Sequence, residues 1–227
     1  MQILKKLTLP SSANRQAGFS LIEIAIVLVI IGLLIGGVLK GQTMVKNSKI
    51  KRMATDTTSV QGAINSYMDS FWSLPGDDAG SATRWATAAV AGDGDGIIEG
   101  LFIPADLTAN AGDETAKAWN HLYCENLIKG TCLGNVATAI TLPVNSLGGS
   151  MGLADGRENT VLGMGRKVVC LRGMISEYAM VYDTQFDDGV GTTGQIRGSA
   201  NNATGATTDA ATAYALANRN IYICTEF

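Results

Sequence analysis

Glu23 is the single charged residue in a long apolar run that extends over residues 19–39. At about 1.5 Å per residue, a helix of this length is roughly 31 Å long and crosses the ~30 Å hydrocarbon core of a bilayer. A charged side chain at the centre of such a span costs roughly 2.5–3.5 kcal/mol, so Glu23 is expected to have a partner or a function. The alternative is that Glu23 lies at the end of the helix and simply reaches the lipid headgroups.

The residues around this carboxylate form a recognisable pattern. A short basic leader ends at Gly18, Phe19 follows it, and Glu23 is the fifth residue after the glycine. This pattern resembles the cleavage and methylation signal of type IV prepilins and type II secretion pseudopilins, in which a prepilin peptidase cuts after the glycine and methylates the new terminal amine. The resemblance implies processing between Gly18 and Phe19. It also implies that Glu23 serves assembly, because its carboxylate would neutralise the terminal amine of the next subunit in an apolar filament core.

A second group of candidate residues is acidic. Asp93, Asp95 and Glu99 lie in a glycine-rich segment, and alternating carboxylates in such a turn can direct their oxygen atoms at a hard cation such as calcium. The spacing is not that of an EF-hand, because two of the ligand positions carry Ala and Phe. Some pseudopilins hold calcium in the head domain, and Asp77 or Asp78 would complete such a site in this chain. The alternative is a tight acidic turn without a metal.

Four cysteines form the third group, and all of them lie beyond the apolar run. An even number of cysteines in an exported chain indicates two disulfides, and four cysteines allow three connectivities. We expect a short loop between Cys124 and Cys132 and a long loop between Cys170 and Cys224, with four free buried thiols as the alternative. The absence of a C-x-x-C spacing argues against a zinc site.

The rest of the chain offers little for catalysis. His121 is the only histidine and no G-x-S-x-G motif is present, so neither a catalytic triad nor a histidine-rich metal site can be assembled. His121 is expected to be a packed or surface residue. Residues 189–194 fit the letters of a dinucleotide-binding fingerprint but lack a convincing strand before them and a helix after them. We expect no enzymatic activity. Asp187 and Asp188 are interpreted as a turn, with a second carboxylate cluster as the alternative.

Charge narrows the functional class further. The 227 residues have a formal net charge of −3, and removal of residues 1–18 with their three cations makes it −6. Because no basic stripe exists outside the long helix, nucleic-acid binding is not expected. Charge does not decide the orientation of the span, since five cations follow it in residues 40–52. The family resemblance places the leader in the cytoplasm and the remainder of the chain in the periplasm.

One long helix must position the processing site. Beyond residue 39 an apolar stripe continues at spacings of four and three residues through Met53, Thr57, Val60, Ile64 and Tyr67. The sequence predicts a helix over residues 19–72, whose first part, about residues 19–39, spans the membrane and whose second part is amphipathic. A proline and a Gly-Asp turn in residues 74–77 end it. Four glycines in residues 32–41 either allow close helix packing or let the helix stretch during assembly.

Residues 73–227 are predicted to form one globular head domain of the α+β class with a small antiparallel sheet. The patterns predict helices over residues 115–129 and 174–184, and strands over residues 139–144, 160–162, 167–171 and 220–224. Trp72, Trp85 and Trp119 are expected in the core, and residues 198–209 in an exposed loop. Short motifs in this part, such as residues 118–122 and the Gly-Asp loop, resemble those of a subset of Gram-negative prepilin-like proteins.

The long helix and the head together predict a pilin-like lollipop fold. The implied function is that of a structural subunit, a pilin, minor pilin or pseudopilin, in a type IV pilus (fimbrium) or a type II secretion pseudopilus. The implied partners are copies of itself and other pilins, the prepilin peptidase and an inner-membrane assembly platform. The protein would be a single-pass inner-membrane protein with a periplasmic head before it enters a periplasmic or cell-surface filament.

Two choices stay open at this point. The missing helix proline and the acidic loop favour a pseudopilin, whereas the long head and the four cysteines favour a pilin. From another class, the alternative is a membrane-anchored periplasmic enzyme or binding module that uses a pilin-like anchor. That alternative predicts that the head acts alone and that Glu23 is dispensable.

Overall fold

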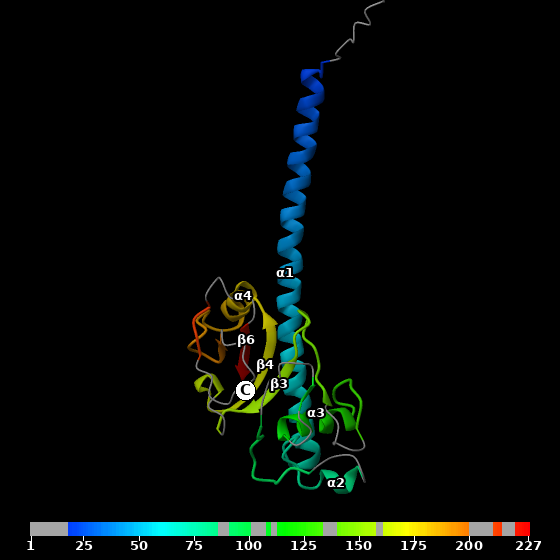
Figure 1. Ribbon diagram of the computed structural model, residues 1–227, viewed down its shortest axis with the longest axis vertical. Coiled ribbons are helices and arrows are strands. Elements are labelled where there is room, and N and C mark those ends of the chain that lie inside the picture. The colour runs from blue at the N-terminus through cyan, green and yellow to red at the C-terminus, as the bar shows by residue number, and fades with distance from the viewer. Residues whose placement is uncertain are drawn as a thin grey trace, which may run out of the picture. The chain divides into compact units, whose positions relative to one another are not determined.

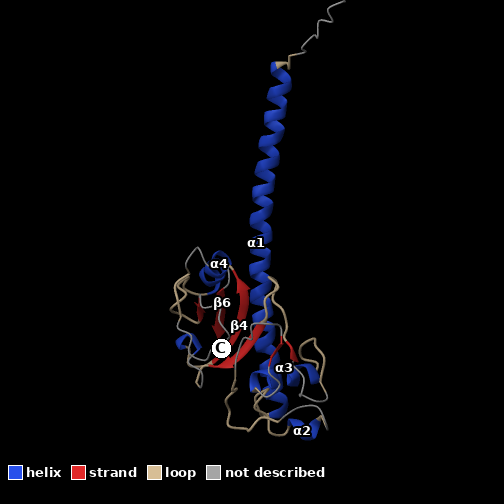
Figure 2. Cartoon of the chain, viewed as in Figure 1, coloured by secondary structure: helices blue, strands red, loops and turns tan. Residues whose placement is uncertain are grey.

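The computed structural model of the chain describes residues 18–85, 91–100, 108–109, 113–133, 140–157, 161–199, 211–214 and 221–227. The chain divides into two compact units, Met1–Met44 and Val45–Phe227. Helix α1 (Leu21–Phe71) begins in the first unit and ends in the second, and the described strands all lie in the second unit (Figure 1, Figure 2).

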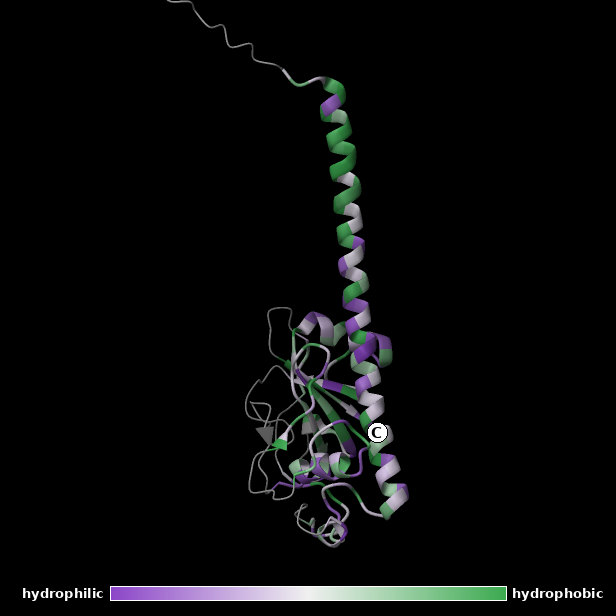
Figure 3. Cartoon of the chain, turned by 90° about the vertical axis from the view of Figure 1, so that its right-hand side faces the viewer, coloured by the Kyte–Doolittle hydropathy of each residue, from purple (hydrophilic) through white to green (hydrophobic). Residues whose placement is uncertain are grey.

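Helix α1 has two parts with different surroundings. In the first unit its side chains are exposed and mostly apolar, as the hydropathy colours of Figure 3 show. Within the second unit the helix is amphipathic, and one of its faces is buried in that unit. The buried residues repeat mainly at spacings of three and four: Ile50, Met53, Thr57, Val60, Ala63, Ile64 and Tyr67. The predicted continuation of the helix beyond the apolar run is confirmed.

A four-stranded antiparallel sheet is the main β structure of the second unit. Its spatial order is β3 (Met151–Asp155), β4 (Lys167–Met174), β6 (Ile221–Glu226) and β5 (Ile196–Ser199). A separate pair joins β1 (Thr108–Ala109) to β2 (Ile140–Thr141), also antiparallel. The predicted α+β class with a small antiparallel sheet is confirmed.

In the described part of the second unit, three shorter α-helices accompany the sheet: α2 (Ser81–Arg84), α3 (Glu114–Cys124) and α4 (Ser176–Phe186). Helix α4 lies beside the beginning of the packed part of α1, where Lys46 forms an ion pair with Glu177. Helix α3 lies beside the other end of α1, where the rings of Tyr67 and His121 stack. The sheet and the two helices therefore hold the second part of α1 along its length (Figure 1).

The sheet separates two hydrophobic clusters, because alternate residues of a strand point to opposite faces. On one face, Val169, Leu171 and Ile223 join the buried face of α1 in the main core. On the other face lies a smaller cluster, formed by Ala154, Leu162, Met164, Val168, Cys170, Tyr222 and Cys224. Since both faces of the central strands are covered, their sequences are apolar without alternation.

Two disulfides link parts of the second unit. Cys124 pairs with Cys132 across the turn that follows α3, and Cys170 pairs with Cys224 between β4 and β6. These are the two pairs expected from the sequence, and the described residues contain no free cysteine.

Two predicted boundaries in the head were wrong. The helix predicted over residues 115–129 ends at Cys124. Asn126 takes a positive φ of 58°, and the disulfide between Cys124 and Cys132 turns the chain back. The loop predicted over residues 198–209 begins later, since Gly198 and Ser199 belong to β5, and residues 200–209 lie outside the described part.

One predicted strand is a helical turn instead. The described part of residues 160–162 lies in the short 3₁₀ helix η1 (Val161–Gly163), in which Leu162 has a φ of 53°. Strands β3 and β5 were not predicted, because both contain glycine and neither shows a clear apolar alternation.

Candidate functional site

The processing junction lies at the start of α1. Gly18 and Phe19 precede the helix, and the Phe19 side chain is 84% exposed. The backbone N–H of Ser20 donates to Glu23 Oε2 at 2.9 Å, and the N–H of Ile22 donates to Ser20 Oγ at 3.4 Å. This arrangement is a variant of the capping box: Glu23 accepts the N–H of the capping residue as in the standard box, but Ser20 accepts from the second helical residue, Ile22, and not from Glu23. Within its own chain, Glu23 therefore stabilises the beginning of α1.

The apolar part of α1 follows directly. By length and composition α1 is a candidate membrane span, and no residue of its most apolar window is buried. A Cβ atom added at Gly32, Gly36, Gly37 or Gly41 would have no neighbouring atom within 4 Å, so these glycines leave open positions along the helix surface. An exposed apolar surface of this length requires lipid or other helices around it.

The acidic loop of residues 91–100 is held by a buried carboxylate from outside the loop. Asp77 is 3% exposed, and its two oxygens accept the backbone N–H groups of Gly94 at 2.7 Å, Asp95 at 3.0 Å and Gly96 at 2.8 Å. Burial raises the pKa of Asp77, although these three N–H groups act in the opposite direction. Successive N–H groups that converge on one anion form a nest, so Asp77 fixes the shape of the loop.

Glu114, the first residue of α3, holds the same loop at a second place. It is 4% exposed, and its carboxylate accepts the N–H groups of Asp93 and Glu99, both at 3.2 Å. Burial raises its pKa as well. No role was assigned to Glu114 from the sequence; its place in the first turn of a helix, where negative charge is favoured, was the available signal.

The structure brings some of the candidate calcium ligands together. One oxygen each of Asp77, Asp93 and Asp95 lies within 4.8 Å of the other two. Glu99 lies outside this group, and Asp78 is engaged elsewhere. Three converging carboxylate oxygens have the chemistry that calcium requires, but Asp77 already accepts three N–H groups. Calcium binding at this loop stays a prediction.

A second acidic group contains Asp183, Asp187 and Asp188. All three carboxylates accept hydrogen bonds from nearby groups of the same unit: Gly189, Val190, Thr193, Ile196 and Tyr214. These bonds close the turn between α4 and β5, as the interpretation of Asp187 and Asp188 as a turn requires. Burial raises the pKa of Asp183.

His121 is fully buried beside the end of α1. Its Nδ1 accepts the backbone N–H of Gly76 at 2.9 Å, and its ring stacks on Tyr67 with 5.8 Å between the centroids. The hydroxyl of Tyr67 donates to Asp78 Oδ2 at 2.6 Å, and Asp78 forms an ion pair with Arg84. Burial raises the pKa of Tyr67. This network fixes the turn that follows α1, so His121 is a packed residue.

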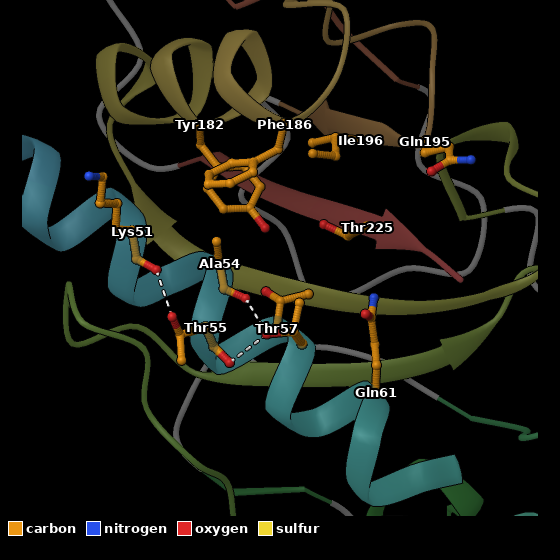
Figure 4. Close-up of a pocket in the computed structure, with 11 residues that line it drawn as sticks. Lys51, Ala54, Thr55, Thr57, Gln61, Tyr182, Phe186, Gln195, Ile196 and Thr225 are labelled. Carbon is orange, nitrogen blue, oxygen red and sulfur yellow. Dashed lines mark hydrogen bonds between the residues drawn. The ribbon is translucent and has the colours of Figure 1, made fainter.

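A surface groove of about 400 Å³ is lined by residues of α1, α4, β5 and β6 (Figure 4). On α1, the hydroxyls of Thr55, Thr57 and Thr58 donate to carbonyls of their own helix at 3.0–3.1 Å. Thr57 is buried, whereas Thr55 and Thr58 are exposed and leave their methyl groups as available surface. Tyr182 and Phe186 of α4 line the groove from the other helix. The groove is suited to apolar side chains and shows no pair of acid and base groups.

Two features were missed or misplaced by sequence reasoning. The cap at the start of α1 was missed, although it could have been predicted because Ser20 and Glu23 have the spacing of a capping box. Trp72 was expected in the core and is 93% exposed, because α1 ends at Phe71 and Trp72 turns with a φ of 55°. Trp119 is buried as expected.

The N-terminal segment matches a known family. The family model described as the prokaryotic N-terminal methylation motif matches residues 13–39. No curated protein and no solved structure matches the chain. The matched residues contain Gly18, Phe19 and Glu23 together with the exposed apolar part of α1. The chain therefore carries a type IV prepilin-like signal, which indicates a type IV pilin-like or pseudopilin-like protein that is processed at this signal.

Proposed function

We propose that the mature chain is a structural subunit of a filament, either a type IV pilus or the pseudopilus of a type II secretion system. The observation that carries this proposal is the first part of α1. It is an apolar helix that begins at the processing signal, and no residue of its most apolar stretch is buried. Such a helix is stable in a bilayer before assembly and among the stems of other copies afterwards.

The second unit fits a location outside the cytoplasm. Two disulfides form readily in an oxidising compartment such as the periplasm. The proposed route is a single-pass protein of the inner membrane with its head in the periplasm, cleavage and methylation by the prepilin peptidase, and insertion into a filament through an inner-membrane platform. Other copies and related pilins are its proposed partners.

Glu23 has two separable properties in this proposal. Its carboxylate accepts the N–H of Ser20 in the capping box, and its charge is available for the terminal amine of Phe19 in a neighbouring copy. Glutamine at position 23 preserves the cap and removes the charge, whereas alanine removes both. The two substitutions therefore distinguish a role in helix capping from a role in assembly.

The test compares Glu23→Gln, Glu23→Ala and Ser20→Ala in cells that make the filament. Each variant is expected in the membrane at the wild-type level. Both Glu23 variants should be absent from isolated filaments, while Ser20→Ala, which keeps the charge, should assemble. Wild-type incorporation of Glu23→Gln would show that the charge is dispensable for assembly, and incorporation of Glu23→Ala as well would show that the whole side chain is. Absence of the wild-type chain itself from isolated filaments would favour the membrane-anchored enzyme or binding module. Recovery by shearing from the cell surface indicates a pilus, and retention in the cell envelope indicates a pseudopilus.

A further inference from the structure

Trp72 combines two unfavourable features. It follows the last residue of α1 with a φ of 55°, a conformation that is usual for Gly or Asn after a helix and an outlier for a bulky residue. Its side chain is 93% exposed, so the backbone strain is not offset by burial of the indole. Trp85 is only partly exposed and Trp119 is buried. A residue that favours neither the local backbone conformation nor the packing is expected at a functional surface.

A cavity of about 480 Å³ lies beside Trp72, within the size range of small-molecule sites. Its lining combines apolar and charged side chains: Met68, Leu74 and Trp72 with Asp69, Arg157 and Lys167. The residues come from the end of α1, the turn after it, the loop after β3 and the start of β4. Segments distant in sequence thus bring an aromatic surface, donors and an acceptor to one place.

Some polar groups that line the cavity are held in place but have donor or acceptor atoms without a hydrogen-bond partner among the described residues. Buried Asp155 accepts hydrogen bonds from Arg157 Nε at 2.9 Å and Nη2 at 2.7 Å, and Nη2 also donates to the carbonyl of Gly96. These bonds orient the guanidinium and leave Nη1 without a partner among the described residues. Lys167 and Asp69 form no side-chain hydrogen bond or ion pair with any described residue. The cavity therefore offers N–H donors from two cations and oxygen acceptors from one exposed carboxylate.

The charge balance selects the kind of ligand. Two cations, Arg157 and Lys167, line the cavity together with two carboxylates, Asp69 and Asp77, and Asp155 lies directly against Arg157. No excess of positive charge is left to attract a phosphate or a carboxylate, and the whole chain has a net charge of −3. A hydroxyl group both donates and accepts hydrogen bonds, so a ring that carries several hydroxyls matches mixed donors and acceptors. An indole face accommodates the apolar C–H face of such a ring.

We propose that this cavity binds a neutral saccharide, with one pyranose ring on the indole of Trp72 and its hydroxyls bonded to Asp69, Arg157 Nη1 and Lys167. The site belongs to the head and does not depend on the filament role, so either proposal can fail without the other. It gives the head a binding function at the surface where α1 ends.

The experiment uses the full chain in an amine oxide detergent, which has no sugar headgroup. Iodide quenches exposed indoles, so Trp72 gives most of the quenchable fluorescence. Cellobiose, lactose and N,N′-diacetylchitobiose serve as neutral probes and glucuronate as the acidic one. We expect a Kd in the millimolar range, so the probes are used at ~10 mM, above that Kd. At this concentration at least one neutral probe should reduce the quenching constant by about twofold or more.

The variants locate the site. Trp72→Ala should abolish probe binding measured by calorimetry, and Asp69→Ala and Lys167→Ala should each weaken it by roughly fivefold, as expected for one hydrogen bond. Lys129→Ala, a change of an exposed lysine outside the cavity, should leave it unchanged. Absence of protection by every neutral probe overturns the proposal, as does stronger protection by glucuronate. Loss of filaments in Trp72→Ala without protection by any sugar would assign Trp72 to a contact between subunits.

Discussion

Cys170 and Cys224 lie directly opposite each other on the paired strands β4 and β6, and a disulfide joins them. Both side chains are fully buried, on the face of the sheet that points away from α1. The bridge encloses a segment with a sequence separation of 54 residues, whereas the bridge between Cys124 and Cys132 has a separation of 8. The last strand of the chain is thus fixed covalently to the centre of the sheet.

The two bridges are expected to contribute unequally to stability. On the chain-entropy model, removal of the long bridge by Cys170→Ala with Cys224→Ala costs about 4 kcal/mol, and removal of the short bridge by Cys124→Ala with Cys132→Ala costs about 2.5 kcal/mol. Urea unfolding of the detergent-solubilised chain, followed by tryptophan fluorescence, measures both losses. Each double variant is the control for the other. Equal losses would mean that chain entropy does not govern the contribution of the long bridge.

The buried carboxylate of Glu114 makes stability depend on pH. Burial raises its pKa above the ordinary value of 4.5, so the folded state binds this proton more tightly than the unfolded state does. Its contribution is fully present below about pH 4.5 and is lost as the pH rises through the folded pKa. The free energy of unfolding should therefore decrease as the pH rises from about 4.5 through the raised pKa of the folded state. Asp155 does not interfere: burial raises its pKa, but the bonds and charge of Arg157 outweigh this and lower it, so its contribution is lost only in more acidic solution.

The Glu114→Gln variant tests this dependence. The glutamine side chain has no carboxyl proton to bind, so the decrease in unfolding free energy as the pH rises above about 4.5 should be smaller than in the wild type. Asp69→Asn is the matched control, because Asp69 is an exposed carboxylate without a described partner, and it should retain the wild-type slope. Burial also raises the pKa values of Asp77 and Asp183, so part of the decrease should remain in Glu114→Gln. An identical slope in Glu114→Gln and the wild type would exclude a contribution of Glu114.

Calcium binding at the acidic loop can be decided by comparison of the two acidic groups. If calcium binds at Asp77, Asp93 and Asp95, calcium at 100 times its Kd stabilises the fold by about 2.7 kcal/mol, and a chelator reverses the effect. Asp93→Asn with Asp95→Asn should remove the shift in Tm. Asp187→Asn with Asp188→Asn, which changes the other group, should retain it. No shift in the wild type, or an equal shift in both double variants, would mean that the loop is an acidic turn.

The sequence was sufficient for features that rest on a long pattern. The stripe from Met53 to Tyr67 predicted the packed part of α1, because each of its residues is buried on one helix face. The apolar β4 and β6 were predicted with inexact bounds: β4 extends three residues beyond the predicted end, and β6 begins one residue later and ends two residues later than predicted. Continuous apolar runs mark covered strands but not their ends. Both disulfide pairs followed from the order of the cysteines and the preference for one short and one long loop.

Features that depend on tertiary contacts could not be predicted from the sequence. Two carboxylates hold the acidic loop from a distance in sequence. Asp77 accepts the N–H of Gly94, 17 residues away, and Glu114 accepts the N–H of Asp93, 21 residues away. The exposure of Trp72 follows from a single φ angle at the end of α1, which no composition rule for tryptophan predicts. The capping box at Ser20, in contrast, is local and could have been predicted.

Replacement of Trp72 by asparagine is expected to stabilise the fold. Asparagine adopts a positive φ readily, and removal of an indole that is 93% exposed sacrifices little buried surface, so the gain should be about 0.5–1 kcal/mol. Leu162→Asn is the matched comparison: its φ of 53° is similar, but its side chain is 1% exposed, so this substitution should cost about 2 kcal/mol or more. Urea unfolding of the three proteins gives the comparison. A loss of stability in Trp72→Asn would show that the indole packs against the chain in solution, and an indole packed in that way could not serve as the open surface for a saccharide ring.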